Sequence, residues 1–287
     1  MRIRVAFAAA GILTLAAWGQ SNIFRSESRL VEVYATVFDS KNHPVDGIEK
    51  EHFQVFEDGA RQEIRSFESA SEELSCAILL DVTSSMRDAL SGVKNAVSDL
   101  VDEMRPGDTT AIYGFSTTLQ TMQEFTTDKS ALKRAVSRAR AQGETALFDA
   151  IAQTAREIES RPGKKAIVLF TDGADNASQL MAHDATRRVY QAGVPIFAVA
   201  EGSALSDSSL LKELRELAEK TGGICYRARN SHEVANVFGD IQAELKHVYL
   251  ISYRPPQSSE AKWRSIKIAV DGMKDYRIRG KQGYFPK

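Results

Sequence analysis

The stretch Cys76-Ala77-Ile78-Leu79-Leu80-Asp81-Val82-Thr83-Ser84-Ser85-Met86 joins a run of apolar residues to a polar segment rich in oxygen-bearing side chains. An unbroken apolar run is typical of a strand that is buried on both faces of a parallel sheet. The segment that begins at Asp81 would then lie at the carboxyl end of that strand, where open α/β sheets bind their ligands. This stretch therefore predicts the fold class and the edge of the sheet that carries the function.

Strand-like and helix-like segments alternate after this stretch. The segment from Leu90 to Met104 has apolar residues at helical spacing and is followed by Pro106-Gly107. Residues 166–170 and 195–200 are further apolar runs of the buried-strand type. The remaining predicted strands are 109–115, 119–125 and 222–226, and the remaining predicted helices are 131–140, 145–160, 178–191, 207–220 and 234–245. The alternation predicts a doubly wound α/β domain with a mostly parallel, Rossmann-like sheet.

Both ends of the chain have a β pattern instead. Strands are predicted at 31–37, 52–56 and 61–67, with Asp58-Gly59 as a hairpin turn, and again at 248–253, 263–270 and 276–279. Neither segment is long enough to build a sound core alone. We therefore expect the two segments to pack together as a small β-sandwich-like domain, with the α/β domain inserted between them.

The first residues have the layout of a secretory signal peptide. Arg2 and Arg4 precede an apolar run that ends at Trp18, and the small residue Gly19 marks the expected cleavage point. The run is short for a membrane span, and an uncleaved anchor is the alternative. We expect an exported protein, periplasmic, cell-surface or secreted, that has no other membrane insertion. The expected divisions are a signal peptide at 1–19, an N-terminal β segment at 20–72, the α/β domain at 73–247 and a C-terminal β segment at 248–287.

Charge and cysteine content exclude some classes of function. The formal net charge is −1, so nothing attracts the chain electrostatically to nucleic acid, and no nucleic-acid partner is expected. Cys76 and Cys225 are the two cysteines, and both lie in apolar segments. A pair of this kind is better explained as buried free thiols than as a disulfide or a reactive site.

Oxygen-bearing side chains follow several predicted strands at the same edge of the sheet. Asp81, Thr83 and Ser85 alternate after the first buried strand, Thr145 opens a helix, and Asp172 follows a later strand. Carboxylates and hydroxyls without His or Cys suit Mg2+, Mn2+ or Ca2+ and argue against Zn2+. Each residue alone is explained by a turn or a helix cap. Their joint occurrence favours a metal site.

The motif Asp81-x-Thr83-x-Ser85, with Thr145 and Asp172, resembles the metal-ion-dependent adhesion site of von Willebrand factor type A domains. The family pattern is Asp-x-Ser-x-Ser, then a distant Thr, then an Asp followed by Gly. Thr83 replaces the usual first Ser and keeps the hydroxyl. The resemblance covers about residues 73–247. It implies that the three hydroxyls contact the ion directly, while the two carboxylates act mainly through water.

The β segments resemble a group of exported bacterial proteins built around such a domain. The resemblance rests on Phe53-Gln54-Val55-Phe56-Glu57-Asp58-Gly59 and on Lys281-Gln282-Gly283-Tyr284-Phe285. It implies no particular activity.

The preferred function is a metal-dependent protein-binding module, for adhesion or complex assembly. Its ion would capture an acidic group of a partner protein, with Glu144 and Gly173 at the rim of the contact. One alternative is a metal-dependent hydrolase, which needs a base beside the ion. Only Glu144 is a candidate base, so we do not expect an enzyme. The other alternative is an envelope protein in which the metal is purely structural.

Two further expectations concern the loops that carry the site. Asp175 and Asn176 are interpreted as turn residues, and a supporting contact to the site is the alternative. The metal-site residues are expected on surface loops, so that their substitution should barely alter the metal-free fold.

Overall fold

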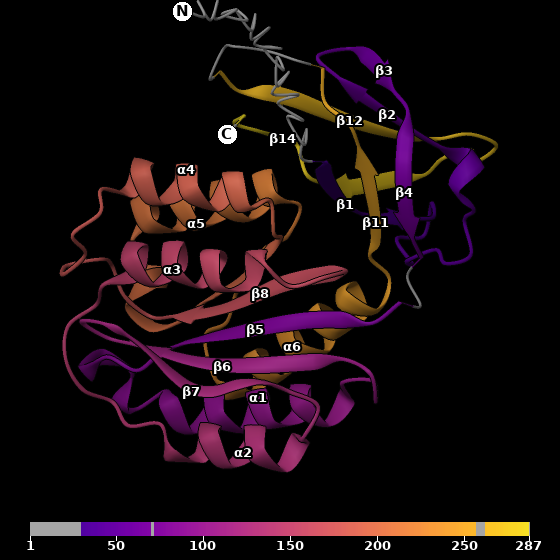
Figure 1. Cartoon of the computed structure of the whole chain (residues 1–287). Coiled ribbons are helices and arrows are strands. Elements are labelled where there is room, and N and C mark those ends of the chain that lie inside the picture. Colours follow the sequence, from indigo (N-terminus) through magenta and orange to yellow (C-terminus); the bar gives the residue numbers. More distant parts are fainter. Residues whose placement is uncertain (1–29, 70–71, 257–261, 287) are drawn as a thin grey trace, which may run out of the picture.

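The computed structural model describes residues 30–69, 72–256 and 262–286. The expected signal peptide at 1–19 lies outside this part of the chain. Figure 1 shows a layered α/β domain with a smaller β domain at its upper right. Within the described residues, no helix combines the length and the apolar character that a membrane crossing requires.

The α/β domain is built on a six-stranded sheet with the order β10-β9-β8-β5-β6-β7. Neighbouring strands are parallel except for the β6–β7 pair, which is antiparallel. The strands are β5 (Leu74–Asp81), β6 (Thr109–Phe115), β7 (Leu119–Thr126), β8 (Lys164–Thr171), β9 (Ile196–Ala200) and β10 (Cys225–Arg227). The prediction of a mostly parallel, doubly wound sheet is confirmed.

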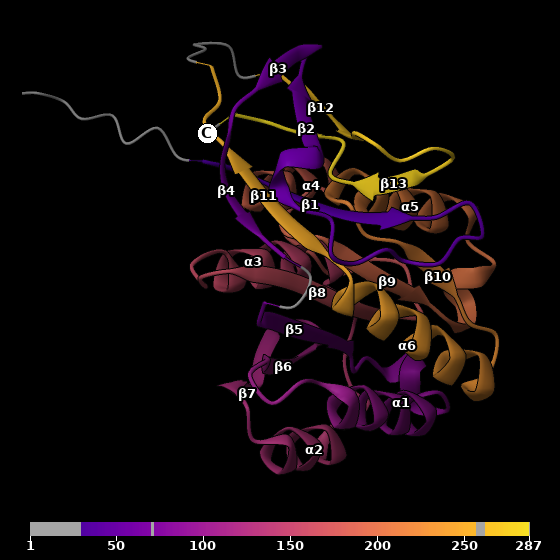
Figure 2. The same cartoon turned by 90° about the vertical axis from the view of Figure 1, so that its right-hand side faces the viewer.

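Helices cover both faces of this sheet (Figures 1 and 2). One face carries α1 (Leu90–Glu103), α2 (Lys129–Arg138) and α6 (Ser231–Lys246), and the other carries α3 (Leu147–Glu159), α4 (Ala182–Ala192) and α5 (Ser208–Thr221). Successive residues of β5 alternate between the two cores. Cys76, Ile78 and Leu80 join the first core, and Ala77 and Leu79 join the second. This alternation explains why residues 76–80 of β5 are apolar without interruption.

The β domain consists of two four-stranded sheets with the orders β13-β1-β11-β4 and β14-β12-β2-β3. Its strands are β1 (Val31–Phe38), β2 (Phe53–Glu57), β3 (Ala60–Gln62), β4 (Ile64–Glu68), β11 (Tyr249–Tyr253), β12 (Arg264–Val270), β13 (Arg277–Gly280) and β14 (Gly283–Tyr284). Each sheet pairs N-terminal with C-terminal strands in antiparallel register. Val33, Phe53, Tyr249 and Ile266 come from both sheets and share one core. The two β segments therefore form one small β-sandwich-like domain, and the α/β domain is inserted between them in the sequence.

The prediction of one continuous strand at 61–67 is wrong. The segment divides at Glu63 into β3, which pairs with β2, and β4, which pairs with β11 in the other sheet. Ile64 and Phe67 are the only apolar residues in 61–67, so the sequence has no pattern that shows where the chain crosses between the sheets.

The β domain packs near the amino ends of the parallel strands. Trp263 lies with its ring centroid 5.4 Å from that of Tyr190 on α4, and Phe285 completes the aromatic group. Lys165, near the start of β8, forms a 3.0 Å ion pair with Glu32 on β1. The carboxyl ends of the strands, which point to the left in Figure 1, are on the side of the sheet away from this contact.

Candidate metal centre

Asp81 is the last residue of β5, and its carboxylate is held from two sides. Its Oδ1 accepts a 2.9 Å hydrogen bond from the backbone N–H of Thr83. Its Oδ2 accepts a 2.8 Å hydrogen bond from the hydroxyl of Thr171 at the end of β8. The first bond shapes the loop after β5, and the second ties the end of β5 to the neighbouring strand β8.

The hydroxyls after β5 form a chain of hydrogen bonds that ends on the second carboxylate. Thr83 Oγ1 and Ser85 Oγ are 2.9 Å apart. The Ser85 hydroxyl then donates to Asp172 Oδ1 over 2.8 Å. Ser85 belongs to a short 3-10 turn, η2 (Ser84–Arg87), and this turn brings its side chain to the edge of the sheet. The structure therefore brings Thr83, Ser85 and Asp172 together as the sequence predicts.

Thr145 reaches the same place from the loop before α3. A Cβ added at Gly173 would lie 3.8 Å from both Ser85 Oγ and Thr145 Oγ1, so the two hydroxyls flank the same glycine. The backbone N–H of Thr145 donates to Asn176 Oδ1 at 2.8 Å, and the N–H of Asn176 returns a bond to Thr145 O at 2.9 Å. Asn176 thus supports the site directly and is more than a turn residue.

Capping of helix α3 accounts for Asp175 but not for Thr145. The N-cap position of α3 is Ala146, which makes no side-chain cap. Asp175 accepts a hydrogen bond from the N–H of Phe148 in the first turn of α3 instead. Thr145 is therefore not needed as a cap.

The site residues are more buried than expected. Asp81 is fully buried, Thr83 is 1% exposed, and Thr145 and Asp172 are each 4% exposed. Only Ser85 is exposed. The expectation that these residues lie at the surface is wrong for the buried four, whose hydrogen bonds tie β5, β8 and the α3 loop together. The tolerance of the metal-free fold to their substitution stays a prediction.

Burial also makes ionisation of the acidic groups at this edge unfavourable. Burial raises the pKa of the Asp81 carboxyl, and the charge of Asp172 adds to the rise. Burial raises the pKa of Asp172 as well. Glu201, directly after β9, is 9% exposed, and burial together with the charge of Asp172 raises its pKa to about 7. A bound dication would reverse these shifts, since it stabilises the ionised carboxylates.

Thr171 and Glu201 also lie at this edge of the sheet, but neither is among the site residues predicted from the sequence. Thr171 follows the predicted strand 166–170, so the sequence indicates its position but not the direction of its hydroxyl. Glu201 also follows a predicted strand end, which was the available signal.

The sequence profile of the von Willebrand factor type A domain matches residues 76–240, more than half of the chain. The chain belongs to the von Willebrand factor type A (VWA) domain family. Its curated relatives are distant: a UPF0353 protein of Mycobacterium avium is 23% identical over 200 residues, which cover 58% of this chain. The chain spans about 59% of the length of that relative. Neither the family description nor the name of the relative denotes an enzymatic activity.

Solved structures support the fold. A von Willebrand factor type A protein from Catenulispora acidiphila has a TM-score of 0.55 at 15% identity, covering 89% of this chain and 73% of its own. Proximal thread matrix protein 1 from the mussel byssus, described with a zinc-occupied MIDAS motif, has a TM-score of 0.54 at 18% identity and covers 66% and 49%. At these identities the likeness concerns the VWA fold alone.

The donor set of this VWA domain fits a hard dication. Among the described residues, no group of three or more His, Cys, Asp or Glu side chains is placed to hold a metal ion, so the candidate site depends on hydroxyl oxygens as well. Oxygen donors with few carboxylates suit Mg2+, which keeps several waters. The fit is supported by the buried Glu201 Oε2, which has no hydrogen-bond partner among the described residues.

The two residues expected at the partner contact differ in exposure. Glu144 is exposed on the loop before Thr145, whereas Gly173 is buried beneath the hydroxyls. Of these two residues, only Glu144 presents its side chain to solvent.

A cavity of about 550 Å3 lies elsewhere, between α3, α4 and the β6–β7 turn. None of its lining residues belongs to the candidate metal centre. Asp149 in this cavity accepts hydrogen bonds from the backbone of Gln179 and Leu180, which accounts for its carboxylate structurally. The lining of this cavity is therefore separate from the candidate ligands.

Proposed function

We propose that this VWA domain binds one Mg2+-type ion and uses it to capture a carboxylate of a partner protein. The ion would be held by the hydroxyls of Thr83, Ser85 and Thr145, with Asp81 and Asp172 beside them. The observation that carries the proposal is the hydrogen-bonded chain from Thr83 through Ser85 to Asp172. It assembles oxygen donors from separate elements at the ligand-binding edge of the sheet.

The chemistry of these donors favours an acidic partner. Neutral hydroxyls donate electron density to a dication but supply no charge, so the ion stays strongly electrophilic. An external carboxylate is then the preferred additional ligand. The exposed Ser85 gives such a group access, whereas the buried Asp81 and Asp172 serve the ion from within.

Binding has better support than hydrolysis. A metal-dependent hydrolase needs a base or nucleophile beside the ion and a pocket for its substrate. Glu144 is exposed, and the 550 Å3 cavity is lined by other residues. We therefore propose an adhesion or assembly module and no enzyme.

The metal and the compartment are part of the proposal. Mg2+ or Mn2+ suits the oxygen donors best, with Ca2+ as a further possibility, and the zinc described in the mussel protein makes Zn2+ a necessary comparison. The N-terminal layout favours export, so the native protein should begin near Gln20 when its N-terminus is sequenced.

The proposal is tested by capture of the partner from the cell envelope in Mg2+ and in chelator. Wild type should retain a protein in Mg2+ and release it in chelator, while Asp172→Ala should capture none. Thr83→Ser is the matched control, because it keeps the hydroxyl and should bind normally. Thermal unfolding of each variant shows that it is folded, which is required because Asp172 is buried. Equal capture by Asp172→Ala, or capture that chelator leaves unchanged, would refute metal-mediated recognition.

A further inference from the structure

Glu201 lies beside Asp172 because of the register of the sheet. Thr171 on β8 pairs with Ala200 on β9, so the next residues along the two parallel strands are Asp172 and Glu201. The Glu201 N–H donates to Thr171 O at 3.0 Å and continues the ladder by one step. Paired residues of parallel neighbours direct their side chains to the same face of a sheet. The side chain of Glu201 is therefore directed to the same face of the sheet as that of Asp172, which accepts the hydrogen bond from Ser85.

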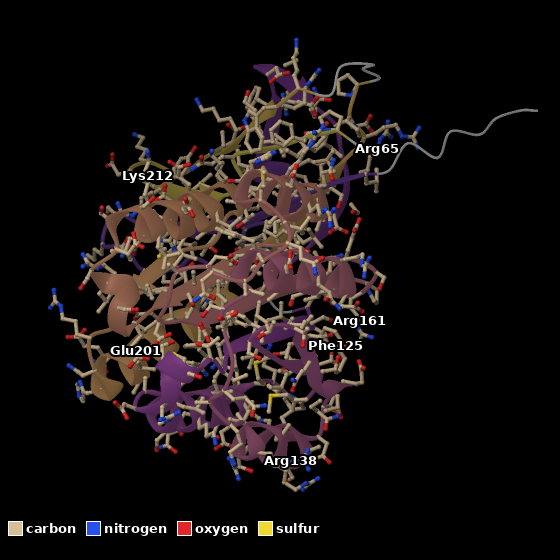
Figure 3. The ribbon with its side chains drawn as sticks, turned by 90° about the vertical axis from the view of Figure 1, so that its left-hand side faces the viewer. Arg65, Phe125, Arg138, Arg161, Glu201 and Lys212 are labelled. Carbon is tan, nitrogen blue, oxygen red and sulfur yellow. The ribbon has the colours of Figure 1, made fainter. Side chains whose placement is uncertain are left out.

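The buried carboxylate of Glu201 is only partly satisfied by the portion of the chain that the structure describes. The residue is 9% exposed, and within the described residues its buried Oε2 makes no hydrogen bond. The next residue, Gly202, passes so close to Asp172 that a Cβ there would lie 3.1 Å from Asp172 Cβ. The negative charge of Asp172 therefore lies beside Glu201, whereas a buried carboxylate needs a cation or a hydrogen-bond donor there. Figure 3 views the molecule from the side of the strands' carboxyl ends, with Glu201 labelled.

A divalent cation removes this conflict. It would attract both Glu201 and Asp172, and its bound waters would donate hydrogen bonds to the free oxygen. The hydroxyls of Thr83, Ser85 and Thr145 are the expected direct ligands, so Glu201 would act through such a water.

We propose that Glu201 is an additional carboxylate of the metal centre, and that it strengthens cation binding through a metal-bound water beside Asp172. The proposal rests on the metal site of the proposed function. It extends that site to β9, a strand that contributes none of the residues of the recognised motif.

The test compares Glu201→Gln with Glu63→Gln by calorimetric titration of the chelator-stripped protein with Mn2+. Both substitutions remove one negative charge, but Glu63 is exposed on the β domain and paired with Arg65. Glu201→Gln should weaken Mn2+ binding roughly tenfold, the size expected for one charge near a dication in a partly aqueous site. Glu63→Gln should leave the affinity within twofold of wild type.

Thermal unfolding gives a second readout that does not depend on any partner. In chelator, Glu201→Gln should melt at a higher temperature than wild type, because the like charge beside Asp172 is gone. Saturating Mn2+ should raise the melting temperature of wild type more than that of Glu201→Gln. Glu201→Asp keeps the charge and should bind Mn2+ more tightly than Glu201→Gln.

The outcomes separate this proposal from the one on which it rests. Wild-type affinity in Glu201→Gln, alongside Mn2+ binding by wild type, would show that Glu201 is a structural group outside the metal centre. Absence of Mn2+ binding by wild type would overturn the metal site itself and this proposal with it.

Discussion

Thr171 shows how a residue outside the recognised motif supports one within it. Its hydroxyl donates to the buried Asp81, and its backbone oxygen accepts the N–H of Glu201. The sequence predicts the oxygen-bearing residues at the strand ends because they follow apolar runs. It does not predict which hydroxyl turns toward which carboxylate, since that depends on the register between β5 and β8 and on side-chain rotamers.

Replacing Thr171 by Val should weaken the site without removing a proposed ligand. The β-branched shape is retained, but Asp81 Oδ2 loses its 2.8 Å donor. We expect a stability loss of about 1–2 kcal/mol, because a buried acceptor is left without its partner. Mn2+ affinity should fall several-fold, as measured by calorimetry. Thr171→Ser restores the hydroxyl and should recover most of the affinity, and equal affinities in all three proteins would show that this bond does not position Asp81.

The elements that are easiest to predict are those whose burial is complete. β5, β8 and β9 each contain a continuous run of five apolar residues, because each strand lies between two layers of helices. The division of 61–67 into β3 and β4, and the short β14, were not predictable, because edge strands of a small sandwich have no distinctive pattern. The sequence also does not show where two backbones approach closely, and Gly223 is such a place.

Alanine substitutions at Gly223 and Gly239 should change the free energy of unfolding in opposite directions, because only Gly223 lies against another backbone segment. A Cβ at Gly223 would lie 2.0 Å from the backbone oxygen of Ile196, so Gly223→Ala must displace the start of β9. Gly239 is exposed on α6 with nothing within 4 Å of an added Cβ. We expect Gly223→Ala to lose about 3 kcal/mol or more, and Gly239→Ala to gain about 0.5–1 kcal/mol from helix propensity. Denaturant unfolding measures both changes, and a neutral Gly223→Ala would contradict this packing.

At the scale of the whole molecule, one buried carboxylate joins strands from both ends of the chain. Glu57 on β2 is 1% exposed and accepts hydrogen bonds from the hydroxyls of Tyr253 on β11 and Tyr284 on β14. Arg264 on β12 lies with Nη2 2.9 Å from Glu57 Oε1. The β domain can therefore form only when the N-terminal and C-terminal segments are both present.

Arg264→Leu should destabilise this domain by about 3–5 kcal/mol, because it leaves Glu57 buried without its cation. In a chain that begins at Gln20, Trp263 is the only tryptophan, so its fluorescence reports the β domain and its contact with α4. Arg65→Leu is the matched control, since Arg65 pairs with Glu63 at the exposed surface and should cost at most about 1 kcal/mol. Similar unfolding midpoints for the two variants would contradict the role given to Glu57.

The β domain contacts α4 and the amino end of β8, which leaves the opposite edge of the VWA domain accessible for an ion and a partner. The central claim is that a dication occupies this edge. Crystals grown with Mn2+ and measured at its absorption edge test it most directly. The account predicts one anomalous peak about 2 Å from the hydroxyl oxygens of Ser85 and Thr145, absent from crystals of Asp172→Ala. No peak at saturating Mn2+, or a peak held by other residues, would contradict it.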